Sequence, residues 1–220
     1  MSSDTGETMI RAAERLFGER GIAAVSLREV AAEAGQRNNS AVTYHFGSRR
    51  GLVDAVFRFR MARIDERRRA MVAALDAEGR PDDLRGLLEA LVYPLSESIG
   101  EDGGRSWYAR FLRQVLLDPE FDALAPSRVD VSRGLATIVD RLHGQLRTLP
   151  APLRDERLAL ALKLVVNALA DHEALLASSR ATTPTSLLAA DLVDVAVAVL
   201  AAPVSASTTR ELRHRTRKGA

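Results

Sequence analysis

The sequence lacks cysteine altogether, and lysine and aromatic residues are scarce. Without cysteine the chain can form no disulfide, no thiolate nucleophile and no cysteine-based zinc site. Aromatic residues make up only 5% of the chain, so a local cluster of them stands out. Lysine occurs only at Lys163 and Lys218, so nearly all positive charge is arginine, which can donate two parallel hydrogen bonds to a phosphate or a guanine edge.

Long uninterrupted apolar segments are missing as well. The most apolar stretch, 187–204, contains Asp191 and Asp194, whereas a membrane span needs about 20 mostly apolar residues. The first residues do not have the basic segment and apolar run of a secretory signal. We therefore expect a cytoplasmic protein with no membrane partner.

The remaining composition is that of a globular protein, with 46% hydrophobic and 27% charged residues in 220. This length suits one small and one medium domain. The formal net charge of +2 does not by itself indicate nucleic acid, but arginines gather in one segment. Those in or beside residues 26–51 are Arg28, Arg37, Arg49 and Arg50.

The segment 26–51 has the pattern of two short helices joined by a polar turn. Ser26 and Glu29 form the S-x-x-E pattern of a capping box, and Gly35 suits the left-handed residue that ends a helix. In the second helix Val42 and Phe46 are four residues apart and can point inward together. The side chains left on its outer face are Thr43, Tyr44 and His45. This pattern predicts a helix-turn-helix whose second helix fits a DNA major groove.

The segment from about Thr8 to Val53 resembles the DNA-binding domain of the TetR family of transcriptional regulators. The resemblance is carried by the stretches IRAAERLFGERG, SLREVAAEAG and AVTYHFGSRRGL. It implies an all-α protein that is not an enzyme and needs no cofactor, with a three-helix DNA-binding domain followed by a larger helical domain for ligand binding and dimerisation. The candidate DNA-binding residues are Ser26, Arg28, Arg37, Asn38, Asn39, Thr43, Tyr44, His45 and Arg49.

Several of these residues also have a purely structural interpretation. Arg28 can reach a DNA phosphate or base edge, or it can stand in solvent. Residues 37–39 can form a polar turn and cap the second helix, or touch the groove. Ser48 can cap the next helix, which places Arg49 and Arg50 in its first turn against the helix dipole. A nearby DNA phosphate would resolve that conflict.

After this segment the chain reads as a series of helices. The expected ranges are 52–78, 84–99 with a kink at Pro94, a helix carrying residues 107–116, 129–149, 153–178 and 187–202. We expect the run 67–69 of three arginines to form a solvated face. The expected domains are residues 1–51 for DNA binding, 52–203 for ligand binding and dimerisation, and 204–220 as a basic disordered tail that adds nonspecific DNA affinity or has no role.

The last two helices of this body are apolar on nearly every side. Such helices must be buried on every side, and a body of this size has too few other helices to cover both. We therefore expect them to form a four-helix bundle with the same pair of a second subunit, which makes the protein a homodimer.

An aromatic cluster in the body is a candidate ligand pocket. It comprises Trp107, Tyr108 and Phe111, with Arg110 alongside, and His143 is assigned to the same pocket. The alternative is that these residues are plain core. Metal binding or acid–base chemistry at Asp140 and His143, or at 171–173, is weakly supported, because consecutive helical residues point in different directions.

The function that we expect is a transcriptional regulator that binds a palindromic DNA operator as a homodimer and is released by an unknown small-molecule effector. One alternative is an activator or a regulator without a ligand. An alternative of another class is a helical-bundle metal-binding protein or enzyme that uses His143 or His172.

Overall fold

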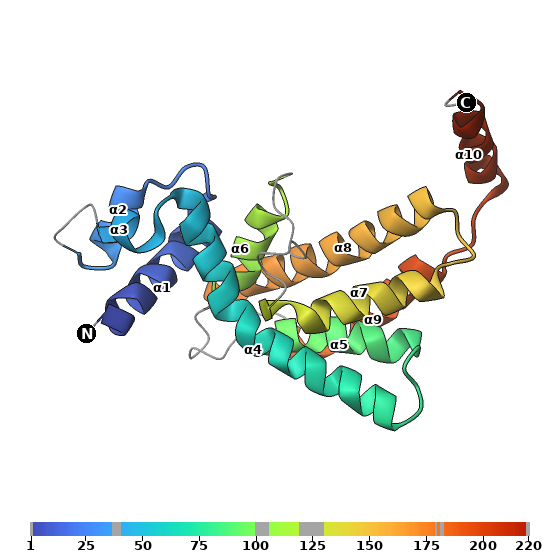
Figure 1. The fold of residues 1–220 in the computed structure, drawn as a ribbon, viewed down its shortest axis with the longest axis horizontal. Helices are drawn as coiled ribbons and strands as arrows, with labels where there is room; N and C mark the ends of the chain where they lie inside the picture. Colours follow the sequence, from blue (N-terminus) through green and yellow to red (C-terminus); the bar gives the residue numbers. More distant parts are fainter. Residues whose placement is uncertain are drawn as a thin grey trace.

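Apart from a short 3₁₀ turn at residues 130–131, the regular elements in the described residues are α-helices, as the sequence predicts. The computed structural model describes residues 2–36, 41–99, 106–118, 130–178, 180 and 183–218. The helices are α1 (Ser2–Arg20), α2 (Leu27–Glu33), α3 (Ala41–Phe46), α4 (Arg49–Ala77), α5 (Leu84–Glu97), α6 (Tyr108–Val115), α7 (Arg133–Gln145), α8 (Ala151–Ala177), α9 (Thr185–Ala201) and α10 (Ala206–Lys218). Helices α1 to α3 form a head at one end, α5 to α9 form the body, and α4 passes from one to the other (Figure 1).

The head is organised by the capping box that the sequence predicts. The Ser26 hydroxyl accepts a hydrogen bond from the Glu29 amide at 3.2 Å, and the Glu29 carboxylate accepts one from the Ser26 amide at 2.8 Å. These two bonds fix the first turn of α2. Gly35 follows the helix with a φ of 68°, in the left-handed region that glycine adopts without strain. The core of the head is then closed by side chains that are fully buried, such as Phe17 and Val42.

Helix α4 is continuous across the expected domain boundary at residue 51. Ser48 caps it by accepting a hydrogen bond from the Gly51 amide at 3.1 Å, which confirms the predicted cap. The helix runs from Arg49 to Ala77, so the head and the body share one rigid element. A rotation of α4 in the body must therefore also move the head.

Helix α6, which has eight residues, lies between α1 of the head and α8 of the body. Helix α5 packs against α9 and α4, and α8 packs against α9. Helix α7 begins at Arg133 rather than at the expected Val129, which lies outside the described residues. The reason is a contact from α4, because the Asp65 carboxylate accepts hydrogen bonds from the first free amides of α7.

Two further expectations are wrong. The arginine run 67–69 is not a solvated face throughout, because Arg68 is only 3% exposed and donates a hydrogen bond to the Leu91 carbonyl at 3.2 Å. The tail is helical rather than disordered, since Ser205 caps α10 by accepting a hydrogen bond from the Thr208 amide at 3.2 Å. Helix α10 lies at the end of the molecule opposite α2 and α3, so it does not extend the DNA-facing surface of its own chain (Figure 1).

Within the described part of the chain, no single helix is long and apolar enough to cross a membrane. Helices α9 and α10 meet the length and composition criteria only together, and they are bent by 59° at the break between them.

Candidate functional site

The outer face of α3 carries three exposed polar or aromatic side chains. Val42 is fully buried and anchors the helix in the head, whereas Thr43, Tyr44 and His45 all face solvent. Tyr44 is 87% exposed, an unusual degree for a large aromatic ring in a chain that contains few. Its ring meets that of His45 edge to face at 5.4 Å between centroids. The face thus offers a hydroxyl, a phenol and an imidazole, all of which can contact bases or phosphates.

Arginines flank this face on the neighbouring helices. Arg28 in α2 and Arg49 and Arg50 at the start of α4 are exposed, as DNA-contacting residues must be. The Ser26 hydroxyl is engaged with Glu29, so the structure gives Ser26 a positioning role in the first instance. The three predicted contacts at Arg37, Asn38 and Asn39 lie outside the described residues.

The carboxylate of Glu29 stays ionised at the start of α2. Hydrogen bonds from the Ser26 backbone and hydroxyl, aided by Arg20, lower the pKa of Glu29 to about 2. Arg20 approaches it to 2.7 Å from the end of α1. The negative charge complements the positive end of the α2 dipole, so the local electrostatics stabilise the start of α2.

A second candidate site is an apolar cavity of about 270 Å³ in the body. Its wall is built by α4, α5, α6, α7 and α8, and all but one of the described lining residues are aliphatic, aromatic or methionine. The exception is Arg68 of α4. Leu112 and Val115 come from α6, whereas Phe57 and Met61 come from α4. Two helices that pack against α1 of the head, α4 and α6, therefore also line the cavity.

None of the five residues predicted to form a pocket lines this cavity. Tyr108 and Phe111 are fully buried in the core, where their rings stack at 5.9 Å between centroids. Trp107 and Arg110 make polar contacts between helices, and His143 lies 3.3 Å from Asp155. The aromatic residues of α6 therefore do not line this cavity, whereas Leu112 and Val115 of the same helix do.

Arg68 is the cavity residue that sequence reasoning missed. A signal was present, because Arg68 is four residues from both Ile64 and Val72 and so falls on the inward stripe of α4. Its neighbours Arg67 and Arg69 are exposed, so the run of three arginines has the pattern of a solvated face.

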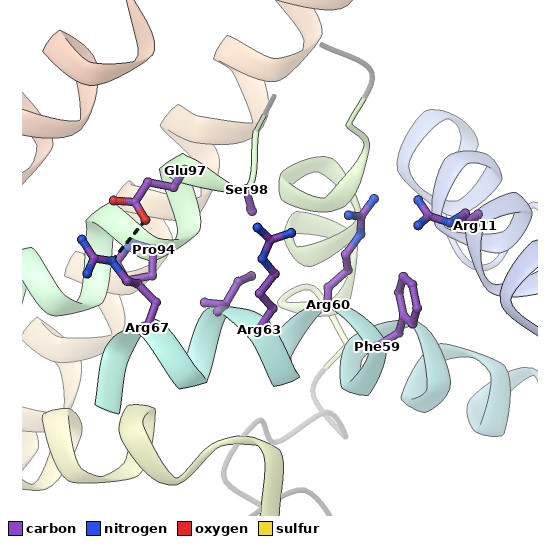
Figure 2. A pocket seen from close by; sticks show the side chains of 9 residues that line it. Arg11, Phe59, Arg60, Arg63, Arg67, Pro94, Glu97 and Ser98 are labelled. Atoms are coloured by element: carbon purple, nitrogen blue, oxygen red, sulfur yellow. Dashed lines mark ion pairs between the residues drawn. The ribbon is translucent and has the colours of Figure 1, made fainter. Parts of the chain in front are cut away.

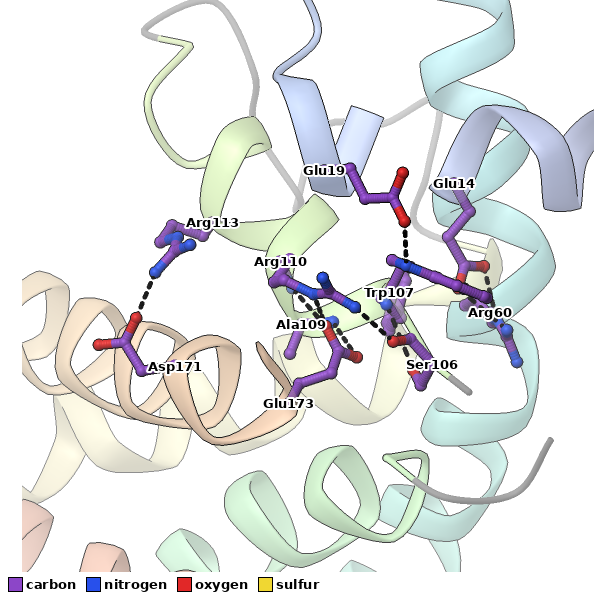
Figure 3. Close-up of polar contacts among 11 residues, drawn as sticks. Glu14, Glu19, Arg60, Ser106, Trp107, Ala109, Arg110, Arg113, Asp171 and Glu173 are labelled. Atoms are coloured by element: carbon purple, nitrogen blue, oxygen red, sulfur yellow. Dashed lines mark hydrogen bonds and ion pairs between the residues drawn. The ribbon is translucent and has the colours of Figure 1, made fainter. Parts of the chain in front are cut away.

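Polar contacts connect α1 of the head to α6, and α6 to α8 (Figure 3). The Trp107 indole donates a hydrogen bond to Glu19 of α1 at 2.9 Å. Glu173 of α8 is buried and accepts hydrogen bonds from the Ala109 and Arg110 amides at 3.2 and 3.0 Å, which fixes the start of α6. A chain of contacts thus runs from α8 through α6 to α1.

Glu14 and Arg60 provide a more direct connection between α1 and α4. The guanidinium donates from Nε at 2.6 Å and from Nη2 at 2.9 Å to the two carboxylate oxygens (Figure 3). Burial raises the pKa of Glu14, and the hydrogen bonds from Arg60 oppose that effect. The pair is 1% and 11% exposed, so solvent screens it little.

A row of arginine side chains faces a hollow between α1, α4 and α5 (Figure 2). The row comprises Arg11, Arg60, Arg63 and Arg67. Acidic residues accompany it, because Arg67 pairs with Glu97 at 3.5 Å, Arg60 with Glu14 and Arg11 with Glu7. Two of these ion pairs join neighbouring helices, Arg60 with Glu14 and Arg67 with Glu97, whereas Arg11 and Glu7 both lie in α1.

The acidic and histidine residues at 171–173 point to different partners, as predicted. Asp171 pairs with Arg113 at 2.6 Å, the His172 ring shares a hydrogen bond with Thr185 at 2.9 Å, and Glu173 caps α6. In the described ranges, no group of three acidic or histidine side chains could hold a metal ion.

The head contains two short helices, and the second has an exposed polar face. The head also shares a long helix with a larger body. This arrangement defines a helix-turn-helix DNA-binding protein. Residues 9–56 match the family model described as bacterial regulatory proteins, tetR family. The head of the chain is therefore similar to the DNA-binding domain of the TetR family of bacterial regulatory proteins, as the sequence resemblance implies.

Solved structures resemble the chain at the level of the fold. A protein of Shewanella sp. PV-4 assigned to the TetR family of transcription regulators has a TM-score of 0.58 at 16% identity, covering 89% of this chain and 95% of its own. The TetR-family transcriptional regulator PfmR from Thermus thermophilus has 19% identity and a TM-score of 0.48, covering 86% of this chain and 96% of its own. No curated protein matches the chain.

Proposed function

We propose that this regulator is a repressor that binds a palindromic operator as a homodimer and is released by a small molecule. The observation that carries the proposal is the position of the apolar cavity, whose wall includes α4 and α6, two helices outside α1 to α3 that pack against α1 of the head. Apolar cavities with few polar groups are typical ligand sites. A ligand that fits better when α4 and α6 are displaced weakens DNA binding, and DNA must weaken ligand binding by the same factor.

The DNA contact proposed for each residue follows from its exposure and its position in the head. Residues 1–51 act as the DNA-binding domain, with α3 in the major groove. Thr43, Tyr44 and His45 lie on the outer face of α3 and contact bases or adjacent phosphates, together with the turn residues Arg37, Asn38 and Asn39. Arg28 and Arg49 bind phosphates on either side, and Ser26 orients α2. Arg49 suits this role because helix-start amides and guanidinium groups both favour a phosphate.

Exposed apolar side chains on α8 and α9 support the proposed dimer. In the single chain the exposed fractions are 49% for Leu160, 59% for Leu187 and 36% for Val195, although both helices also bury an inner face in the body. Large apolar residues gathered on neighbouring helices mark an interaction surface. A second copy of the same pair of helices would cover them in a two-fold arrangement.

The proposal is tested by selecting fragments from a pool of random DNA with the purified wild-type protein. We expect enrichment of one palindromic sequence whose half-sites are centred about one helical turn of DNA apart, roughly 10 base pairs, or somewhat further. Titration of the ligand class proposed below should release the protein from that sequence. A protein that enriches only single half-sites, or nothing, would contradict the dimeric operator.

A further inference from the structure

Arg68 carries a buried positive charge with incomplete hydrogen bonding. The residue is 3% exposed. Its Nη2 donates to the Leu91 carbonyl at 3.2 Å, and its Nη1 contacts the Met61 sulfur at 3.2 Å. Its Nε is buried and has no hydrogen-bond partner. Neither existing contact supplies a negative charge, so the guanidinium, which stays protonated in proteins, lacks a direct counter-ion among the described residues.

The nearest acidic group is committed elsewhere. Asp65 lies one turn before Arg68 on α4, but its two carboxylate oxygens accept hydrogen bonds from the Gly134 and Leu135 amides, each at 2.9 Å. It neutralises the positive end of the α7 dipole and acts on Arg68 only from a distance. Burial lowers the pKa of Arg68, and Asp65 opposes this effect only in part. A buried charge in this state costs free energy that a suitable ligand would recover.

A second unsatisfied polar group lies near the same place. The Tyr108 hydroxyl is buried without a hydrogen-bond partner, and its ring is fully buried. Burial raises the pKa of Tyr108, and Arg68 is the largest charge that opposes this rise. Tyr108 therefore remains a neutral donor within electrostatic range of the guanidinium. Tyr108 does not line the cavity, so the Arg68 guanidinium is the charged group that a carboxylate in the cavity would meet.

We infer that the effector is an organic acid with an apolar body and a single carboxylate, bound in the cavity with the carboxylate at Arg68. This inference rests on the proposed ligand-released function and names the class of ligand. The remainder of the described lining is apolar, so it suits a hydrocarbon chain or ring but no second charge. A dianionic phosphate would exceed the one positive charge available, and a neutral molecule would leave that charge uncompensated.

The cavity size limits the ligand. Its volume of about 270 Å³ compares with roughly 30 Å³ for each water in the liquid, which corresponds to on the order of ten non-hydrogen atoms. Straight-chain acids of about eight to ten carbons therefore serve as suitable probes. Their methyl esters keep the apolar body but lack the negative charge, so each acid has a matched neutral control.

The test is calorimetric titration of the full chain with octanoate, decanoate and their methyl esters. We expect wild type to bind the acid at least about ten times more tightly than the ester, because hydrogen bonds to a charged group are worth more than neutral ones. In Arg68→Met this preference should disappear. Arg67→Met removes the neighbouring exposed arginine by the same substitution, and it should retain the preference.

Stability provides a second measurement. Arg68→Met removes an uncompensated buried charge and fills its space with an apolar side chain, so the ligand-free variant should melt at the same temperature as wild type or higher. Decanoate should raise the melting temperature of wild type and of Arg67→Met but not of Arg68→Met. If Arg68→Met does not fold, Arg68→Lys keeps the charge and should still bind the acid more tightly than the ester.

Equal binding of acid and ester by wild type, or an unchanged preference in Arg68→Met, would overturn the inference. These measurements contain no DNA, so they are independent of the proposed repression. Acid binding that depends on Arg68 but does not release operator DNA would leave the ligand site standing and refute ligand-released repression. Operator binding without any acid binding would refute the ligand site and leave the proposed operator binding standing.

Discussion

Glu14 of α1 and Arg60 of α4 form a buried, two-pronged ion pair with N–O distances of 2.6 and 2.9 Å. Arg60 lies one residue before Met61, which lines the apolar cavity. The same stretch of α4 is therefore attached to the DNA-binding head on one side and exposed to the proposed ligand on the other. This relationship supports the proposed coupling between the cavity and the DNA-binding head.

Breaking that pair should destabilise the protein strongly. In Arg60→Met the Glu14 carboxylate is left buried without its main partner, and removal of one partner of a buried pair costs roughly 3 kcal/mol or more. Arg58→Met is a matched control in the same helix, because Arg58 pairs with Asp130 at 2.9 Å on the surface. Such exposed pairs contribute less than about 1 kcal/mol. Urea unfolding at neutral pH measures both losses, and equal losses would contradict the assignment.

The contact between α1 and α6 is tested with a glycine pair. A Cβ added at Gly18 would lie 2.9 Å from the Trp107 carbonyl oxygen and 3.2 Å from the Trp107 Cβ. A Cβ added at Gly6 would have no neighbour within 4 Å. Gly6→Ala should stabilise α1 by up to about 1 kcal/mol, because alanine favours a helix. Gly18→Ala should instead lower stability by about 1 kcal/mol or more, since it forces two packed helices apart. Thermal unfolding distinguishes the two variants. A higher melting temperature for both would contradict the prediction, because it would show that α6 shifts to admit the new methyl group at little cost.

The capping box of α2 should make its stability depend on acid pH. The pKa of Glu29 is lowered to about 2 from a usual value of 4.5, so its contribution is present above pH 4.5 and is lost as the pH falls from 4.5 towards 2. Ser26→Ala should therefore be least stable relative to wild type at pH 7, with a smaller difference at pH 3. Ser48→Ala removes the cap of α4, where Gly51 occupies the position of the acid, and its deficit should not change with pH. Stability deficits of Ser26→Ala and Ser48→Ala that change with pH in the same way would refute the assigned role of Glu29.

The proposed dimer surface leads to a prediction about assembly. Leu187→Arg places a charge on the exposed face of α9, where Leu187 is 59% exposed in the single chain. The chain should still fold, but the dimer should dissociate at micromolar concentration, because the charge would be buried against the partner. Leu117→Arg is the control, since Leu117 is 73% exposed in the turn after α6. Sedimentation analysis that finds both variants dimeric would place the interface elsewhere.

Local sequence signals predicted the head well. Ser26 with Glu29 and Ser48 with Gly51 are contacts within four residues, so their geometry follows from the chain alone. The outer face of α3 followed from the spacing of Val42 and Phe46. Features that depend on distant residues were missed: the start of α7 is fixed by Asp65, which lies 69 residues before Gly134.

The cavity was the least predictable part. Apart from Arg68, its described lining consists of ordinary apolar residues from five helices, and periodicity indicates only that each of these faces inward. Whether the inward faces meet or leave a space depends on how the helices pack, which no local pattern contains. Arg68 could have been found on the inward stripe of α4, but a charged residue on that stripe contradicts the rule that buried positions are apolar.

The central claim is that the outer face of α3 reads DNA, and salt-dependent binding of the selected operator tests it most directly. Wild type, a Tyr44→Ala, His45→Ala double variant and a His143→Ala control are titrated on operator and random DNA at two salt concentrations. We predict that wild type and the control prefer the operator and bind less tightly at high salt, because phosphate contacts release counter-ions. The double variant should lose the operator preference while remaining folded. A double variant that discriminates operator from random DNA as well as wild type does would contradict the account.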